Sequence, residues 1–138
     1  MDKSLNYLAL ARKAGRVELG EEPVGAISRE GKAYLVIVAQ DAGDHTWRRA
    51  KSFVSGTEQI CIRVPYTKDD LGRSIGRTAL AIAAFTDPAL AQAFAQNLPE
   101  EAACPDVVES LQKRAEHIRK RQQEAKAHRK NVRKGRKT

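Results

Sequence analysis

The stretch Ala33-Tyr34-Leu35-Val36-Ile37-Val38-Ala39 decides the fold, and Gln40-Asp41-Ala42 closes it. Its apolar residues run on without the polar alternation that a half-exposed strand would show. Continuous apolar runs of this length are typical of strands buried on both faces of a sheet. The sequence therefore predicts a central strand over residues 33–39.

Helical and strand patterns alternate on either side of this strand. Gly15 ends a first helix, Pro23 is tolerated in the first turn of a second, Asp44 is expected to cap a third, and Asp87-Pro88 opens a later one. The predicted helices cover residues 4–14, 21–30, 44–53, 69–75 and 88–97, and the predicted strands cover residues 16–19, 33–39, 59–64 and 79–85. Such alternation implies a mixed or parallel sheet with helices on both faces, which is the α/β class.

A second informative stretch is Leu71-Gly72-Arg73-Ser74-Ile75-Gly76. Thr67 and Asp70 stand at the spacing of a capping box, and Gly76 stands where a helix commonly ends. The pattern predicts a short helix after a turn. It carries no catalytic group.

Composition limits the class of protein further. The chain has 138 residues, 41% of them hydrophobic and 5% aromatic, enough for one modest aliphatic core. No apolar stretch approaches the roughly 20 residues of a membrane span, and the first residues lack the features of a secretory signal, so we expect a cytoplasmic protein without membrane contact. Cys61 and Cys104 have no partner at metal-ligand spacing, so neither a metal nor a cofactor is expected.

Positive charge is concentrated at the C-terminus. Residues 113–138 hold twelve Lys or Arg against two acids, whereas residues 1–112 hold thirteen Lys or Arg against fifteen acids. We expect a domain over residues 1–98, then a linker and a basic tail over residues 99–138, in which Asp106 caps a helix that frays or is disordered after Ile118. The tail predicts sequence-independent phosphate contacts, which we assign to Arg119, Lys120, Arg121, Arg129, Lys130, Arg133, Lys134, Arg136 and Lys137.

A third informative stretch, over residues 9–22, reads Ala-Leu-Ala-Arg-Lys-Ala-Gly-Arg-Val-Glu-Leu-Gly-Glu-Glu. Together the three stretches resemble the ribosomal protein family of L-seven-Ae and L-thirty-e type. The resemblance is closest to the bacterial YlxQ-like branch and spans roughly residues 5–98. It implies a three-layer α-β-α sandwich with a four-stranded mixed sheet. It also implies binding of kink-turn RNA, a duplex bent sharply beside sheared G·A pairs, whose bend opens a groove that regular RNA keeps closed to side chains.

In that family three segments meet at one edge and grip the RNA. Carried over by position, they predict RNA contacts from Gly20, Glu21, Glu22, Trp47, Arg48, Lys68, Arg73, Gly76, Arg77, Thr78 and Ala79. The sequence departs from the family pattern Gly-x-Asn-Glu-x-x-Lys, because Glu22, Pro23 and Ala26 stand at the Asn, Glu and Lys positions.

Several of these residues also have structural interpretations. Glu21 and Glu22 suit a helix start, where acids interact favourably with the helix dipole. Trp47 suits the core of an amphipathic helix as well as it suits base stacking. Arg73 suits a tight turn in which it binds nearby carbonyls.

The hypothesis that follows is a non-catalytic RNA-binding protein, a monomer, that recognises kink-turn-like or bulged RNA and associates with the ribosome or its RNA. The alternative is a protein-interaction adaptor whose basic tail alone binds RNA. An enzyme is disfavoured, because the sequence has no nucleophile elbow, phosphate-binding glycine loop or metal-ligand cluster, and its aspartates stand at caps and turns.

Overall fold

Helices and strands alternate through the chain. The computed structural model describes residues 2–135, with side chains as far as residue 129. The elements in order are α1 (Lys3–Lys13), β1 (Val17–Leu19), α2 (Glu21–Arg29), β2 (Leu35–Val38), α3 (Asp44–Val54), β3 (Ile60–Arg63), α4 (Lys68–Ser74), β4 (Ile82–Phe85), α5 (Pro88–Gln96), the 3-10 helix η1 (Glu100–Ala102) and α6 (Pro105–Gly135).

The four strands form one mixed sheet in the order β1-β4-β2-β3. Strand β2 runs parallel to β3 and antiparallel to β4, which also pairs antiparallel with β1. All four residues of β2 and all four of β4 are buried, as their unbroken apolar runs predict. The central position of the strand within residues 33–39 is confirmed.

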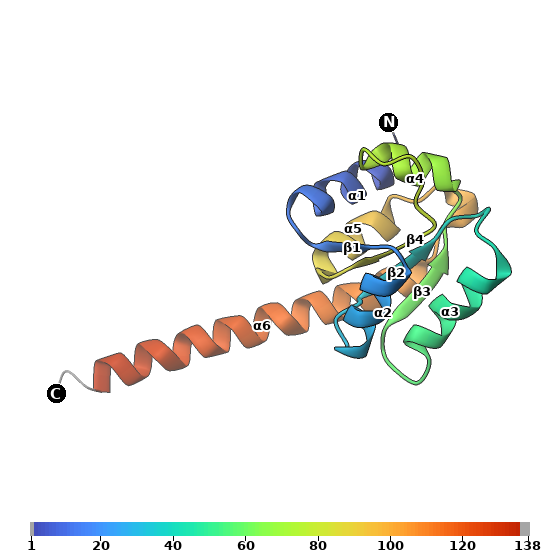
Figure 1. Ribbon diagram of the computed structural model, residues 1–138. Coiled ribbons are helices and arrows are strands. Elements are labelled where there is room, and N and C mark those ends of the chain that lie inside the picture. The colour runs from blue at the N-terminus through green and yellow to red at the C-terminus, as the bar shows by residue number, and fades with distance from the viewer. Residues whose placement is uncertain (1, 136–138) are drawn as a thin grey trace.

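Helices cover both faces of the sheet. Figure 1 shows α1, α4 and α5 on one side and α2 and α3 on the other. Helix α1 contacts both α4 and α5, while α2 contacts α3. The aromatic pair Phe85 and Phe94, with ring centroids 5.1 Å apart, joins β4 to α5. The predicted three-layer α-β-α sandwich is therefore confirmed.

The helix starts follow the sequence except at α3 and at α6, which begins at Pro105 although Asp106 was expected to cap it. Thr67 and Asp70 form the predicted capping box of α4, and Asp87 caps α5 by accepting from the N–H groups of Ala89 and Leu90. Asp44 was expected to cap α3, but Gly43 occupies that position and Asp44 is the first helical residue. A carboxylate in the first turn still interacts favourably with the helix dipole.

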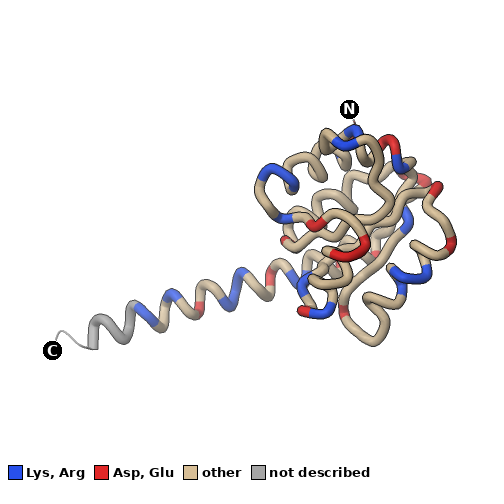
Figure 2. Tube along the Cα trace, in the orientation of Figure 1, with Lys and Arg blue, Asp and Glu red and all other residues tan. Residues whose placement is uncertain are grey.

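Helix α6 begins at Pro105 and joins the globular body to its basic end. Its first turns pack on α5, and they bury Leu111 and Ala115. Beyond them the helix leaves the body (Figure 1), and its charged residues there are mostly Lys and Arg (Figure 2). The helix runs on to Gly135, through the stretch expected to fray. The division of the chain at residue 98 stays a prediction.

In the part of the chain that the structure describes, no helix combines the length and apolar character needed to cross a bilayer.

Candidate functional site

Three backbone segments meet at one end of the sheet. The N–H of Gly20, just before α2, donates to the carbonyl of Ile82 at the start of β4 (3.0 Å). The N–H of Ala39, just after β2, donates to the carbonyl of Ala81 (2.9 Å). The entry to α2, the exit from β2 and the approach to β4 are therefore neighbours. We call this end of the sheet the strand-end edge.

Helix α4 joins the same edge. The N–H of Lys68 donates to a carboxylate oxygen of Asp41 (2.8 Å), and the carbonyl of Lys68 accepts from the N–H of Leu80 (2.9 Å). A Cβ atom on Gly72 would lie 2.6 Å from the backbone N and Cα of Ala79, so only glycine permits this approach. Gly76, with φ +75°, turns the chain out of α4. Loop 76–79 is thereby pressed against α4.

Most of the predicted edge residues are accessible. Gly20, Glu21 and Lys68 are half-buried, and the exposed residues are Glu22, Arg48, Arg73, Gly76, Arg77, Thr78 and Ala79. Helix α2 begins after Gly20, whose φ of +95° suits glycine, and no side chain caps this helix. First-turn N–H groups without a side-chain cap are available to an external acceptor.

An ion pair connects α2 and α3 beside the edge. Arg49 Nε lies 3.4 Å from a carboxylate oxygen of Glu21, and the Arg49 guanidinium lies 5.4 Å from the centroid of the Phe53 ring. Glu21, Glu22, Ala26 and Arg49 line a hollow of about 390 Å³ between the two helices. Sequence reasoning did not single out Arg49, because nothing in the local pattern says which side of α3 faces α2.

Trp47 contacts other parts of the protein. Its half-buried ring packs against the core, with the Arg63 guanidinium 4.9 Å and the Lys51 ammonium 5.5 Å from the ring centroid. Trp47 therefore contacts cations of α3 and β3, while Arg49 reaches α2. A base stacking on Trp47 would have to share the ring with these cations. Its role as a stacking platform stays a prediction.

Burial keeps the thiol of Cys61, in β3, in its neutral form. Burial raises the pKa of Cys61 to about 11, although Lys51 and Arg63 act in the opposite direction. A neutral thiol is a poor nucleophile and a poor metal ligand. Within the described residues, no group of three or more His, Cys, Asp or Glu is placed to hold a metal ion.

The predicted phosphate contacts of the tail lie along α6. Arg119, Lys120, Arg121 and Arg129 are exposed on the helix. For Lys130, Arg133 and Lys134 only the helical backbone is described, and Arg136 and Lys137 lie outside the described residues. The four with described side chains lie away from the strand-end edge, because α6 leaves the body elsewhere (Figure 1).

The sandwich fold and the relatives of this chain place it among proteins of the L-seven-Ae and L-thirty-e type. No model of a known protein family matches the chain. It is 35% identical over 95 residues to the RNA-binding protein YlxQ of Bacillus subtilis (strain 168), covering 66% of this chain and 86% of that protein. The RNA-binding protein YlxQ of Enterococcus faecium is 33% identical over 75 residues, 54% of this chain and 72% of that protein. The chain belongs to the YlxQ family.

Two solved structures share the fold. A protein of unknown function from Bacillus halodurans C has a TM-score of 0.64 and 28% identity, covering 69% of this chain and 95% of that one. The Giardia lamblia 15.5kD RNA binding protein has a TM-score of 0.59 over 80% of this chain and 86% of that one, and its 18% identity supports the fold alone.

Proposed function

We propose that this chain is an RNA-binding protein without catalytic activity, which recognises structured RNA of the kink-turn or bulged kind through the strand-end edge. One observation carries this function. The segments around Gly20, Lys68 and residues 76–79 meet at one end of the sheet, in a chain 35% identical to a protein named for RNA binding.

The edge offers chemistry suited to a bent backbone. Uncapped N–H groups at the start of α2 can donate to phosphate oxygens or base-edge acceptors, and exposed Arg77 of loop 76–79 supplies a charged donor at the same edge. Regular A-form RNA hides its base edges in a deep, narrow major groove, so a sharp bend or a bulge is needed to present them. Glu22 and Ala26 differ from the residues typical of kink-turn binders, so we propose recognition of bent RNA with weaker affinity for a standard kink-turn.

The partner that we propose is the ribosome or its RNA, met by a monomer in the cytoplasm. Helix α6 would add contacts to phosphates of any sequence, since its exposed cations can release counterions from the RNA backbone. The strand-end edge would then recognise the bases and the shape of the RNA, and α6 would supply much of the affinity for it.

Titration of the full-length protein against three RNAs tests this function. A kink-turn, a bulged duplex and a plain duplex are compared at one salt concentration, with Arg77→Glu as the edge variant. We expect Arg77→Glu to weaken binding to the bent and bulged RNAs about tenfold or more, because hydrogen bonds to charged groups are worth roughly 1.5 to 3 kcal/mol. The charge-matched control Lys13→Glu, on exposed α1, should weaken all three slightly and equally.

The adaptor is the second candidate. It is favoured by the mixed charge at the edge, where Glu21 is already paired with Arg49. Equal binding of all three RNAs by the wild type and by Arg77→Glu would contradict shape recognition and favour the adaptor.

A further inference from the structure

A second hollow lies at the opposite end of the sheet, beneath α6. It has a volume of about 560 Å³ and is lined by Tyr34, Glu58, Ile118 and four basic side chains of α6, Lys113, Arg114, His117 and Arg121. Tyr34 immediately precedes β2, whereas Asp41 of the strand-end edge follows it. The hollow and the edge are therefore separated by the whole length of the strand.

Arg114 is held in place before any ligand arrives. Its guanidinium lies 4.4 Å from the centroid of the Tyr34 ring, and its Nη1 donates to the backbone carbonyl of Glu58 (3.4 Å). The backbone of Tyr34 is itself tied to β4, because its N–H donates to the carbonyl of Phe85 (3.0 Å). Since a guanidinium has five N–H donors and one is used here, Arg114 can still bind an anion with two parallel hydrogen bonds.

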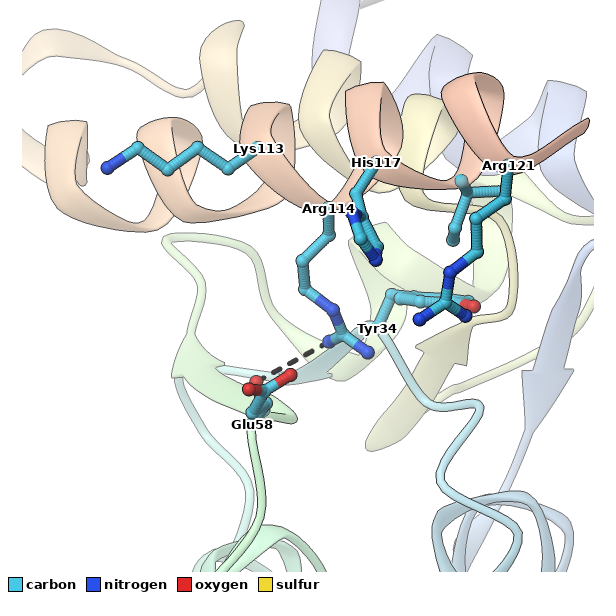
Figure 3. A pocket seen from close by; sticks show the side chains of 7 residues that line it. Tyr34, Glu58, Lys113, Arg114, His117 and Arg121 are labelled. Carbon is cyan, nitrogen blue, oxygen red and sulfur yellow. Dashed lines mark hydrogen bonds between the residues drawn. The ribbon is translucent and has the colours of Figure 1, made fainter. Parts of the chain in front are cut away.

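The other basic side chains of α6 in the lining differ in direction. Figure 3 shows Arg114 and Arg121 reaching from α6 toward Tyr34, with His117 on the turn between them. Their positions are three and four residues apart, which places them on one face of the helix. Lys113 extends away from Tyr34 in Figure 3 and pairs with Glu109 at 3.2 Å. Arg114 and Arg121 are therefore the two guanidinium groups of the site.

The positive lining continues past Tyr34. An adjoining hollow of about 340 Å³ shares Tyr34 and Ile118 and adds Arg16 and Arg119. The acid there, Asp87, already accepts from the N–H groups of Ala89 (2.8 Å) and Leu90 (3.3 Å) as the cap of α5. Cations thus outnumber acids along both hollows. One of the two acids, Asp87, already accepts hydrogen bonds from the first turn of α5.

We infer that these hollows, which we call the α6 groove, bind the phosphodiester backbone of an RNA strand, with Arg114 and Arg121 holding phosphates at a site apart from the strand-end edge. The assignment rests on the proposed function for the identity of the partner. Planar guanidinium groups match phosphate oxygens in pairs, and a row of them along a helix matches a chain of phosphates better than a single anion. In the groove, Arg114 is fixed in position by Tyr34 and the carbonyl of Glu58, whereas the cations farther along α6 are freely exposed.

Binding of the full-length protein to a labelled single-stranded RNA, measured over a range of salt, tests the groove. Arg114→Ala/Arg121→Ala should weaken binding about tenfold or more and reduce the salt slope by about 1.4, because each phosphate contact on a single strand contributes about 0.7. The control Lys3→Ala/Lys13→Ala makes the same change in charge on α1 and should do much less. An equal effect of both pairs would overturn the groove and leave only general attraction by charge.

Two variants that keep the net charge constant test whether the groove binds RNA through specific geometry or only through its positive electrostatic potential. Tyr34→Leu removes the ring that holds Arg114, and Arg114→Lys keeps the cation but removes the paired donors. Each should weaken RNA binding about two- to fivefold, as expected for the loss of a cation-π contact or of bidentate geometry. Thermal unfolding shows whether Tyr34→Leu is folded, and Arg114→Lys tests the point independently. Unchanged binding by a folded Tyr34→Leu and by Arg114→Lys would overturn the proposed role of Arg114.

A final experiment tests whether the phosphate bound in the groove comes from an RNA strand or from a free nucleotide. UMP is titrated alone into the wild type and into Arg114→Ala/Arg121→Ala. Saturable binding of UMP that needs these arginines, with RNA binding unaffected by their loss, would overturn the assignment to RNA. Failure of the wild type to bind any RNA would contradict the proposed function itself, whereas loss of binding on Arg77→Glu without any effect of the groove variants would contradict the groove alone.

Discussion

The strand-end edge and the α6 groove lie at opposite ends of one sheet and differ in what they offer. The edge is made of backbone turns, a glycine contact between α4 and loop 76–79, and mixed charges that include the Glu21–Arg49 ion pair. The groove is made of cationic side chains on one helix face, with Arg114 held over Tyr34.

This difference separates two kinds of recognition. Backbone groups in fixed turns respond to the shape of a partner, whereas arginines beside a hollow respond to phosphate, which is the same in every sequence. One small domain can therefore select an RNA by its shape at one end of the sheet and gain affinity from phosphate contacts at the other end.

The largest effect should come from breaking the sheet that both regions share. Val36→Asp puts an unpaired charge at a position that is 0% exposed, at a cost of several kcal/mol against a total stability of about 5 to 15 kcal/mol. We expect loss of the folded circular dichroism spectrum and of RNA binding at both sites. The control Leu10→Asp, at a side chain 49% exposed, should stay folded. A folded Val36→Asp protein with wild-type melting temperature would contradict the central position of β2.

Shortening α6 beyond the groove should change affinity without changing selectivity. Deletion of residues 123–138 removes seven Lys or Arg and one acid, but keeps Leu111, Ala115 and Arg121. We expect an unchanged melting temperature, and a loss of at least about tenfold in affinity at low salt for bent and plain RNAs alike, because phosphate neutralisation is independent of sequence. A loss confined to bent RNA would show that the distal helix reads shape.

Gly72→Ala should damage the edge and spare the groove. The added Cβ would lie 2.6 Å from the backbone of Ala79, so loop 76–79 must move, at a cost of about 1 to 3 kcal/mol in unfolding free energy. Preference for bent over plain RNA should fall, while the salt slope stays the same. Gly43→Ala is the control for RNA selectivity: its Cβ would meet nothing within 4 Å, so loop 76–79 and the preference for bent RNA should stay unchanged, whatever the loss of the N-cap glycine of α3 costs in stability. Equal effects of the two substitutions would argue against a special role for the contact between α4 and loop 76–79.

The smallest expected effect is a gain at the edge. Ala26 is exposed one turn after Glu22, so Ala26→Lys adds a cation that Glu22 can orient by an i,i+4 pair. We expect affinity for a standard kink-turn to rise about two- to fivefold, since a cation near a helical surface contributes up to roughly 1 kcal/mol. Ala26→Gln, without the charge, serves as the control. An equal gain for plain duplex would mean that the lysine acts only through general attraction.

Much of the fold could be predicted because its determinants are local. The unbroken apolar run around Val36 fixes a buried strand, and the spacing of Thr67 and Asp70 fixes the start of α4. The start of α3 was misassigned at Asp44, since glycine and aspartate are both acceptable at an N-cap and only the backbone decides between them. The sequence left the end of α6 open between a frayed helix and disorder, because a helix without an apolar stripe gives no periodic signal.

The candidate sites depended more on contacts between distant residues. The edge was predicted through family resemblance rather than from local pattern, and the hydrogen bond from Gly20 to Ile82 joins segments far apart in the chain. The direction of Trp47 toward Arg63, and of Arg49 toward Glu21, needs the packing of α3 on its neighbours. For the groove, the sequence did carry a signal, the spacing of Arg114, His117 and Arg121, but only the position of Tyr34 under α6 turns it into a site.

Helix α6 also fixes a distance. Its 31 residues span about 46 Å at 1.5 Å per residue, which exceeds the roughly 26 Å expected for twice the radius of gyration of a 100-residue domain. Among the residues whose side chains are described, Ala115 is the last buried one on α6, and the helix from there to Gly135 extends about 30 Å. An arm of this kind lets a 15.3 kDa protein touch two places on a large partner whose separation is set by helix rise, where a flexible linker would leave it free to vary.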